Sequence, residues 1–140
     1  MCMVEDNEQY AYFFVVDGFD PADITARVGV PPTECWRRGE ICPRRQMERK
    51  FSRWSLHSRL NRDKDLEAHI ADVLSQLDAN PEAFAAVSRE FGGVMQLVGY
   101  FRREYPGLHF KRAITEGLAR YALSVDFDFY GLYSHRREDT

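Results

Sequence analysis

Residues 36–54 carry many arginines set among aromatic side chains. The guanidinium group of arginine is a planar fork of donors that matches a carboxylate or a phosphate. The indole of tryptophan can stack on a nucleic-acid base or hold a guanidinium group against its face. This combination is typical of surfaces that bind nucleotides, single-stranded nucleic acid or acidic proteins. The candidate binding residues are Trp36, Arg37, Arg38, Arg44, Arg45, Arg49, Arg53 and Trp54, with Lys50 and Phe51 between them.

The window of residues 36–64 differs in charge from the rest of the chain. It holds ten Lys or Arg against three Asp or Glu, a net charge of +7, whereas the whole chain of 140 residues carries −3. The remaining residues therefore carry −10. A contrast of this size concerns partners and association, not the fold. It predicts one surface that attracts an acidic group in a molecule that otherwise repels it.

The overall charge restricts the kind of partner. A pI near 5.8 is low for a dedicated nucleic-acid-binding domain, which is usually strongly basic. We therefore expect another protein with an acidic surface as the partner and regard nucleic acid as unlikely. The alternative is a solvated basic loop whose arginines pair with acids elsewhere in the chain, with both tryptophans in the core.

Two aspartates near the end of the chain form a second candidate site. Asp126 and Asp128 are two residues apart on a predicted strand, so both carboxylates face the same side. Neighbouring carboxylates can bind Mg²⁺ or take part in acid–base chemistry. A metal site needs further oxygen ligands, and no spacing in the sequence supplies them. We therefore interpret the pair as the polar face of a half-exposed strand.

The sequence lacks the motifs of the commonest enzymes. His109 follows a turn at Gly107 and could act as a base, although a lone histidine in a turn is more often structural. No pair of histidines or cysteines has zinc spacing. A phosphate-binding loop, a nucleophile elbow and a dinucleotide-binding fingerprint are all missing. We therefore expect a protein that is not an enzyme, with no catalytic residue, metal or cofactor.

Cysteine use and hydropathy point to the cytoplasm. The three cysteines are few and odd in number, which fits a reducing compartment. We expect Cys35 to be buried and Cys42 to be a loop thiol, with Cys2 at the start of the chain. No apolar run approaches the roughly 20 residues of a membrane helix. The first residues also lack the basic start and apolar stretch of a signal peptide.

Periodicity and capping residues predict the elements that position these side chains. Asp20 and Pro21 form a cap and first helical position, and Gly29 ends that helix. The predicted strands are 10–17, a short one from Trp36, 51–59, 94–102 and 124–133. The predicted helices begin near Pro21, Leu66, Pro81 and Ile114.

This order indicates an α+β fold in one domain that spans residues 1–140. We expect a mainly antiparallel sheet with helices packed on one face. The first six elements suggest a ferredoxin-like β-α-β-β-α-β start, followed by a further α-β unit. The ordered core should extend from about 9 to 133, with a mobile tail after it. Leu74 and Phe127 should both be buried.

Motifs along most of the chain resemble an uncharacterised bacterial family, the DUF4279 domain of unknown function. The resemblance runs from about Tyr10 to Tyr133 and implies a small single domain that stands alone in the cell. It brings no catalytic residue, cofactor or activity with it. The matching motifs are Tyr12, Phe19-Asp20-Pro21, Ile24-Thr25, Gly29-Val30, Thr33, Trp36-Arg37, Gly39, Trp54-Ser55-Leu56, the helix of Leu66, Gly107-Leu108-His109 and Asp126-Phe127-Asp128-Phe129-Tyr130.

Two functions remain open at this point. The first is a non-catalytic protein-binding module that uses the basic, tryptophan-flanked surface, a toxin-neutralising partner being one such role. The second is a small-ligand or nucleotide-binding domain, which could have enzymatic activity. It requires Trp36, Trp54 and His109 to converge on one pocket, with Arg37 beside them.

Overall fold

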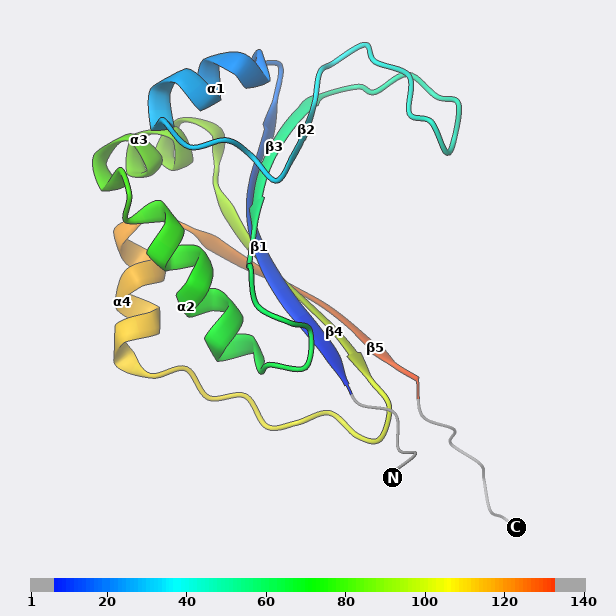
Figure 1. Cartoon of the computed structure of the whole chain (residues 1–140), viewed down its shortest axis with the longest axis vertical. Coiled ribbons are helices and arrows are strands. Elements are labelled where there is room, and N and C mark those ends of the chain that lie inside the picture. Colours follow the sequence, from blue (N-terminus) through cyan, green and yellow to red (C-terminus); the bar gives the residue numbers. More distant parts are fainter. Residues whose placement is uncertain (1–6, 133–140) are drawn as a thin grey trace.

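The computed structural model describes residues 7–132, and these form a layer of helices against one sheet (Figure 1). The order of elements confirms the predicted alternation, including the two consecutive helices after the third strand. The elements are β1 (Glu8–Asp17), α1 (Pro21–Val28), β2 (Glu34–Trp36), β3 (Ser52–His57), α2 (Leu66–Leu77), α3 (Pro81–Phe91), β4 (Val94–Phe101), α4 (Arg112–Arg120) and β5 (Ser124–Gly131).

The sheet is mixed but mostly antiparallel, which confirms the α+β class. Its strand order is β2-β3-β1-β4-β5. β1 pairs antiparallel with both β3 and β4, and β2 pairs antiparallel with β3. The β4–β5 pair is parallel, which the sequence did not predict. The reason is that α4 crosses over between two neighbouring strands, and such a connection makes them parallel.

The helices all lie on one side of the sheet, and the first of them begins and ends as predicted (Figure 1). The Asp20 carboxylate accepts a hydrogen bond from the Ala22 amide at 3.0 Å, which satisfies one of the free donors of the first turn. Gly29 has a φ of 72°, a left-handed conformation that ends α1 at little cost for glycine. Local sequence therefore fixes where α1 starts and stops.

The core lies between the helices and the near face of the sheet. Alternate residues of β1 point into it, and Phe13 meets Trp54 and Phe84 edge-on at ring-centroid distances of 6.2 and 5.8 Å. Trp54 is fully buried, and its indole N–H donates to Thr25 Oγ1 at 3.0 Å. A buried indole needs such a partner for its single donor. Trp54 therefore belongs to the core.

The two residues that we expected to be buried, Leu74 and Phe127, differ in their exposure to solvent. Leu74 of α2 is 7% exposed, as predicted, whereas Phe127 of β5 is 54% exposed. The prediction for Phe127 is wrong because β5 is the edge strand, and the alternation of its residues says nothing about how far the helix layer extends.

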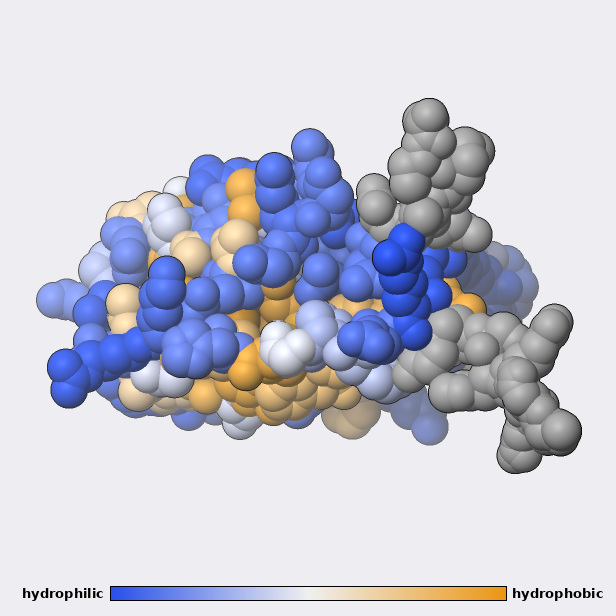
Figure 2. Space-filling view, turned by 90° about the horizontal axis from the view of Figure 1, so that it is seen from below, coloured by the Kyte–Doolittle hydropathy of each residue, from blue (hydrophilic) through white to orange (hydrophobic). Residues whose placement is uncertain are grey.

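In the view from below, hydrophilic residues cover much of the surface and hydrophobic residues gather along its lower edge (Figure 2).

The two cysteines of the described chain, Cys35 and Cys42, differ in their exposure to solvent. Cys35 is exposed, contrary to prediction, and Cys42 is partly buried. Cys35 lies on the short edge strand β2, which explains its exposure. Cys2 and the predicted tail lie outside the described residues. Within residues 7–132, no helix is long and apolar enough to cross a membrane.

Candidate functional site

The face of the sheet that points away from the helices is rich in aromatic residues. On β1 the residues at 9, 11, 13 and 15 are buried against the helices, so Tyr10, Tyr12 and Phe14 point to the opposite side and are half-buried. We call this the open face. The strand register adds His57 beside Tyr12 and adds Arg53 beside both Val16 and Trp36.

A ribbon formed by residues 37–51 extends from this part of the sheet, and we call it the basic arm. Its two sides are joined by backbone hydrogen bonds from Gly39 to Arg49, from Arg49 to Glu40 and from Cys42 to Met47, at 2.9, 2.7 and 2.8 Å. Figure 1 shows the arm projecting from the end of β2 and β3 on the side of the sheet opposite the helices. The arm therefore bounds the open face at one end.

A groove of about 1260 Å³ lies between the basic arm and the open face. Met47 and Phe51 line it, and both are more than half exposed, at 59% and 56%. The charged residues that line the groove outnumber the acids by four cations. They are Arg44, Arg45, Arg49, Lys50, Arg53 and Arg62 against Glu34 and Glu48.

Three arginines of the groove lie on aromatic rings. The guanidinium carbon of Arg49 is 3.6 Å from the centre of the Trp36 ring. Arg53 lies 4.2 Å above Phe14, and Arg62 lies 4.2 Å above Tyr10. Such contacts can leave N–H donors at the edge of a guanidinium group available. Arg53 already donates one of them to the Tyr12 hydroxyl at 3.3 Å.

Most cations of the groove have no ion-pair partner among the residues that the structure describes. Among residues 7–132, Arg49 and Arg53 form no ion pair, and the same holds for the cations at 44, 45 and 50. Arg62 lies 3.7 Å from Glu8, a contact between two exposed groups that contributes little. The groove is therefore a positive surface that the described chain does not neutralise.

The other predicted site residues lie outside the groove. Arg37 pairs with Asp20 at 3.2 Å, and Arg38 lies next to Gly18, in a shallow hollow of about 300 Å³ beside α1. Trp54 faces the core, and the exposed His109 lies on the connection between β4 and α4. The pocket predicted from Trp36, Trp54 and His109 does not form, because β3 presents Trp54 to its helix-covered face.

Comparison with known proteins identifies the family. The family model described as Domain of unknown function (DUF4279) matches residues 7–132 of the chain, which is most of its length. The chain belongs to this family. No curated protein and no solved structure matches it.

Sequence reasoning missed three side chains of the site in this DUF4279 domain. Tyr10, Phe14 and Arg62 line the groove or hold its cations, yet none stood out as a binding residue. The run of residues 10–16 is apolar on both alternating sides, so it does not say which rings face the core. For Arg62, the only signal in the sequence was its place within the positively charged window of residues 36–64.

Asp126 and Asp128 lie on one face of β5, as predicted, and both are exposed. Both belong to the open face, because they pair in register with Gln96 and Val98, which in turn pair with Tyr12 and Tyr10. Within residues 7–132, no group of three or more His, Cys, Asp or Glu could hold a metal ion. Two carboxylates of this kind form an acidic strip.

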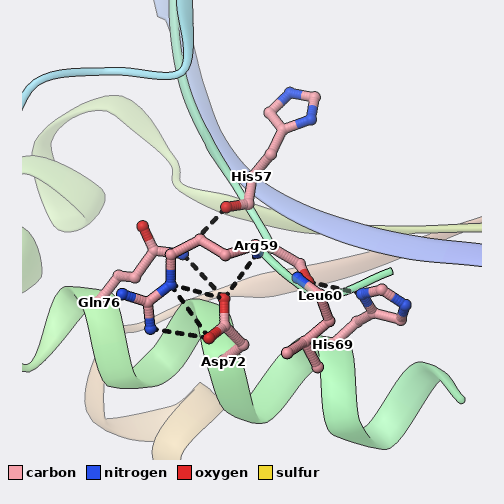
Figure 3. Close-up of polar contacts among 7 residues, drawn as sticks. His57, Arg59, Leu60, His69, Asp72 and Gln76 are labelled. Atoms are coloured by element: carbon pink, nitrogen blue, oxygen red, sulfur yellow. Dashed lines mark hydrogen bonds and ion pairs between the residues drawn. The ribbon is translucent and has the colours of Figure 1, made fainter. Parts of the chain in front are cut away.

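A polar network holds the end of β3, from which His57 projects (Figure 3). Asp72 of α2 accepts hydrogen bonds from the backbone amide and the guanidinium group of Arg59, both at 2.8 Å. Gln76 donates to the His57 carbonyl at 2.9 Å and to Asp72 at 3.0 Å. Burial alone would raise the pKa of Asp72, but the Arg59 hydrogen bonds outweigh it and hold the pKa below its usual value. This network fixes β3 against α2.

Burial disfavours the protonated form of two histidines beside this network. The His57 ring stacks on Tyr12 at a centroid distance of 4.4 Å, and His69 is fully buried next to the Ser58 hydroxyl. Burial lowers the pKa of both imidazoles. Within the described residues, Nε2 of each ring is buried without a hydrogen-bond partner. A protonated ring would therefore carry a buried Nε2–H donor with no acceptor among the described residues.

Because the pKa values of these two histidines are lowered, we expect the folded chain to lose stability in mild acid. The unfolded chain binds a proton at each histidine with a pKa of about 6.5. In the folded chain the pKa values of these histidines are lower, so the unfolded chain binds protons first as the pH falls. The contribution of the two neutral histidines to the free energy of unfolding is therefore complete above the unfolded pKa, and it is lost as the pH falls through the folded pKa values. We expect the melting temperature to fall between about pH 7 and pH 5. Calorimetry over this range measures it.

A matched pair of variants separates this effect from general acid sensitivity. His57→Phe keeps a ring against Tyr12 but cannot titrate, so the fall in melting temperature should become shallower. His109→Gln changes an exposed histidine and is the control. If both variants keep the wild-type slope, the His57 imidazole does not contribute to the acid sensitivity.

Proposed function

We propose that the chain is a non-catalytic binding module whose groove takes an acidic segment of another protein. One observation carries this proposal: the Arg49 and Arg53 guanidinium groups lie over aromatic rings of the open face and form no ion pair within residues 7–132. Holding a guanidinium on a ring reduces the ordering that a binding event would otherwise require. The groove is thus arranged for carboxylates before any partner arrives.

The apolar residues of the groove supply a second source of affinity. Met47 and Phe51 are exposed beside the cations, and burying each contributes roughly 1.5–3 kcal/mol. Charged groups at such a surface mainly set specificity and the rate of association, and their effect decreases with salt. The best partner is therefore an extended acidic segment that also carries apolar side chains. Covering the acidic surface of a toxin would be one use of such a module.

A nucleotide or a small anionic ligand is the second candidate. Arginine forks match phosphate as well as carboxylate, and the stacked Tyr12–His57 pair continues to Tyr10 at a centroid distance of 6.1 Å. Against this candidate, Trp36 already holds the Arg49 guanidinium group on one ring face. The groove is also larger than the roughly 300–1,000 Å³ of most small-molecule pockets. These observations favour the protein segment.

Two further expectations accompany this proposal, one about the type of fold and one about the cellular compartment. The antiparallel order β2-β3-β1-β4 supports a ferredoxin-like interpretation of the first six elements. Free Cys35 and Cys42 support a reducing compartment, such as the bacterial cytoplasm. Both remain predictions.

Tryptophan fluorescence provides a direct test of groove occupancy. The chain has two tryptophans, so Trp54→Phe leaves Trp36 as the only indole, and Trp36 lines the groove. We expect a peptide of alternating Glu and Leu to change the Trp36 emission in a saturable way that weakens with added salt. ATP and a single-stranded oligonucleotide should change it less. A stronger response to ATP would favour the second candidate, and no response to any probe would contradict a recognition groove.

A further inference from the structure

The outer edge of β5 carries backbone groups that pair with no strand among residues 7–132. β5 is the last strand of the sheet, and within residues 7–132 no strand lies beyond it. The amides of Ser124 and Leu132 donate to β4-side carbonyls, those of Gly93 and Phe101, at 3.1 and 2.7 Å. Because alternate residues of a strand direct their backbone groups to the same side, those of Val125, Phe127 and Phe129 point outward.

The two faces of this edge have different chemistry. On the helix side, Phe127 is 54% exposed and contacts Phe129 at a ring-centroid distance of 5.4 Å. Phe129 in turn meets the fully buried Phe101 at 5.1 Å, which connects the exposed ring to buried aromatic residues. On the open face, Asp126 and Asp128 are exposed. The edge thus offers apolar rings on one face and carboxylates on the other.

We propose that β5 accepts a strand from a second protein in which basic and apolar residues alternate. Its backbone would pair with Val125, Phe127 and Phe129 and extend the sheet by one strand. Its cations would lie opposite Asp126 and Asp128, while its apolar side chains would cover Phe127. This surface is separate from the groove, whose lining residues do not include any residue of β5.

A second copy of the chain fits this edge less well. Pairing two β5 strands antiparallel about Phe127 places Asp126 of one copy opposite Asp128 of the other, and like charges directly opposite are destabilising. Edge strands are commonly protected by charged residues. Here the charges occupy one face only and leave Phe127 exposed on the other. A basic partner strand satisfies both faces.

Amide exchange with a synthetic strand tests the proposal. The probe is a peptide of alternating Lys and Val, added to the isotopically labelled full chain. We expect slower exchange at the amides of Val125, Phe127 and Phe129, which point outward in the free chain. N-methylation of the peptide at its β5-facing amides should remove this protection, and N-methylation at the other amides should preserve it. Charge attraction alone would make no such distinction.

Variants complete the experiment. Asp126→Asn together with Asp128→Asn should weaken peptide binding about tenfold, and Phe127→Thr should weaken it while keeping the strand amide. Reversal of Arg44, Arg45 and Arg49 to Glu should not weaken it, so failure of the groove proposal and failure of this one are distinguishable. The proposal is overturned if both methylated peptides protect equally, if the peptide gives no protection, or if protection appears without peptide as protein concentration rises.

Discussion

Replacing Leu74 with Asp is expected to leave the chain unfolded. Leu74 is 7% exposed and packs between α2 and α4, so closely that a Cβ on Gly117 would meet its Cδ1 at 2.7 Å. The substitution removes apolar burial of roughly 1.5–3 kcal/mol and adds a buried carboxylate without a partner, at a further cost of several kcal/mol. That sum approaches the 5–15 kcal/mol, roughly, by which a typical domain is stable. Circular dichroism and thermal melting measure the loss.

The same helix offers matched controls. Ser75→Asp places the same carboxylate on the exposed neighbour and should melt close to the wild type. Leu74→Met keeps an apolar side chain of similar volume and should cost less than about 1.5 kcal/mol. If Leu74→Asp melts like the wild type, α2 does not turn this face toward the core.

Reversing the arginines at 44, 45 and 49 to Glu should abolish binding of the acidic segment. The groove lining changes from four net positive charges to two net negative charges, because each reversal changes the balance by two. Truncating one partner of a desolvated charge pair typically costs about 2–5 kcal/mol, so we expect a loss of roughly a hundredfold or more. Titration with the peptide of alternating Glu and Leu measures it, and capture of partners from lysate provides a second comparison.

Two further variants separate charge from geometry. Reversing Arg89, Arg103 and Arg112 to Glu gives the same total charge on exposed positions that do not line the groove, and binding should be largely kept. Arg49→Lys keeps the charge but loses the flat guanidinium on Trp36, so an intermediate loss is expected. Equal binding by the groove variant and the wild type would end the case for this surface.

The elements of the fold could be predicted where the sequence contains a local physical signal. The Asp20-Pro21 pair and Gly29 define α1 without reference to the rest of the chain. The apolar spacing from Leu66 to Leu77 predicts the buried side of α2 in the same way. The parallel β4–β5 pair and the exposure of Phe127 depend instead on the order of strands, which no local pattern of residues reports.

Only part of the candidate site could be predicted from the sequence, because local patterns again do not report which side of the sheet a residue faces. The charge window indicates the basic arm, but neighbouring positions on one strand face opposite ways. Arg53 therefore points to the groove and Trp54 to the core, although they are adjacent in sequence. Likewise, Arg37 pairs with Asp20, whereas Arg49 lies on the ring of Trp36, the neighbour of Arg37 in sequence. Choosing between such neighbours requires knowing which side of the sheet the helices cover.

The placement of the basic arm also bears on how this protein could diversify. The arm leaves β2 at Trp36 and returns to β3 at Ser52, next to the register pair Trp36–Arg53. Both of its ends are thus held by the sheet, and the core contains none of its residues. Surface connections of this kind tolerate changes in length and composition. Changes to the proposed binding surface can therefore be confined to one contiguous segment of the chain, while the sheet and helices beneath it stay the same.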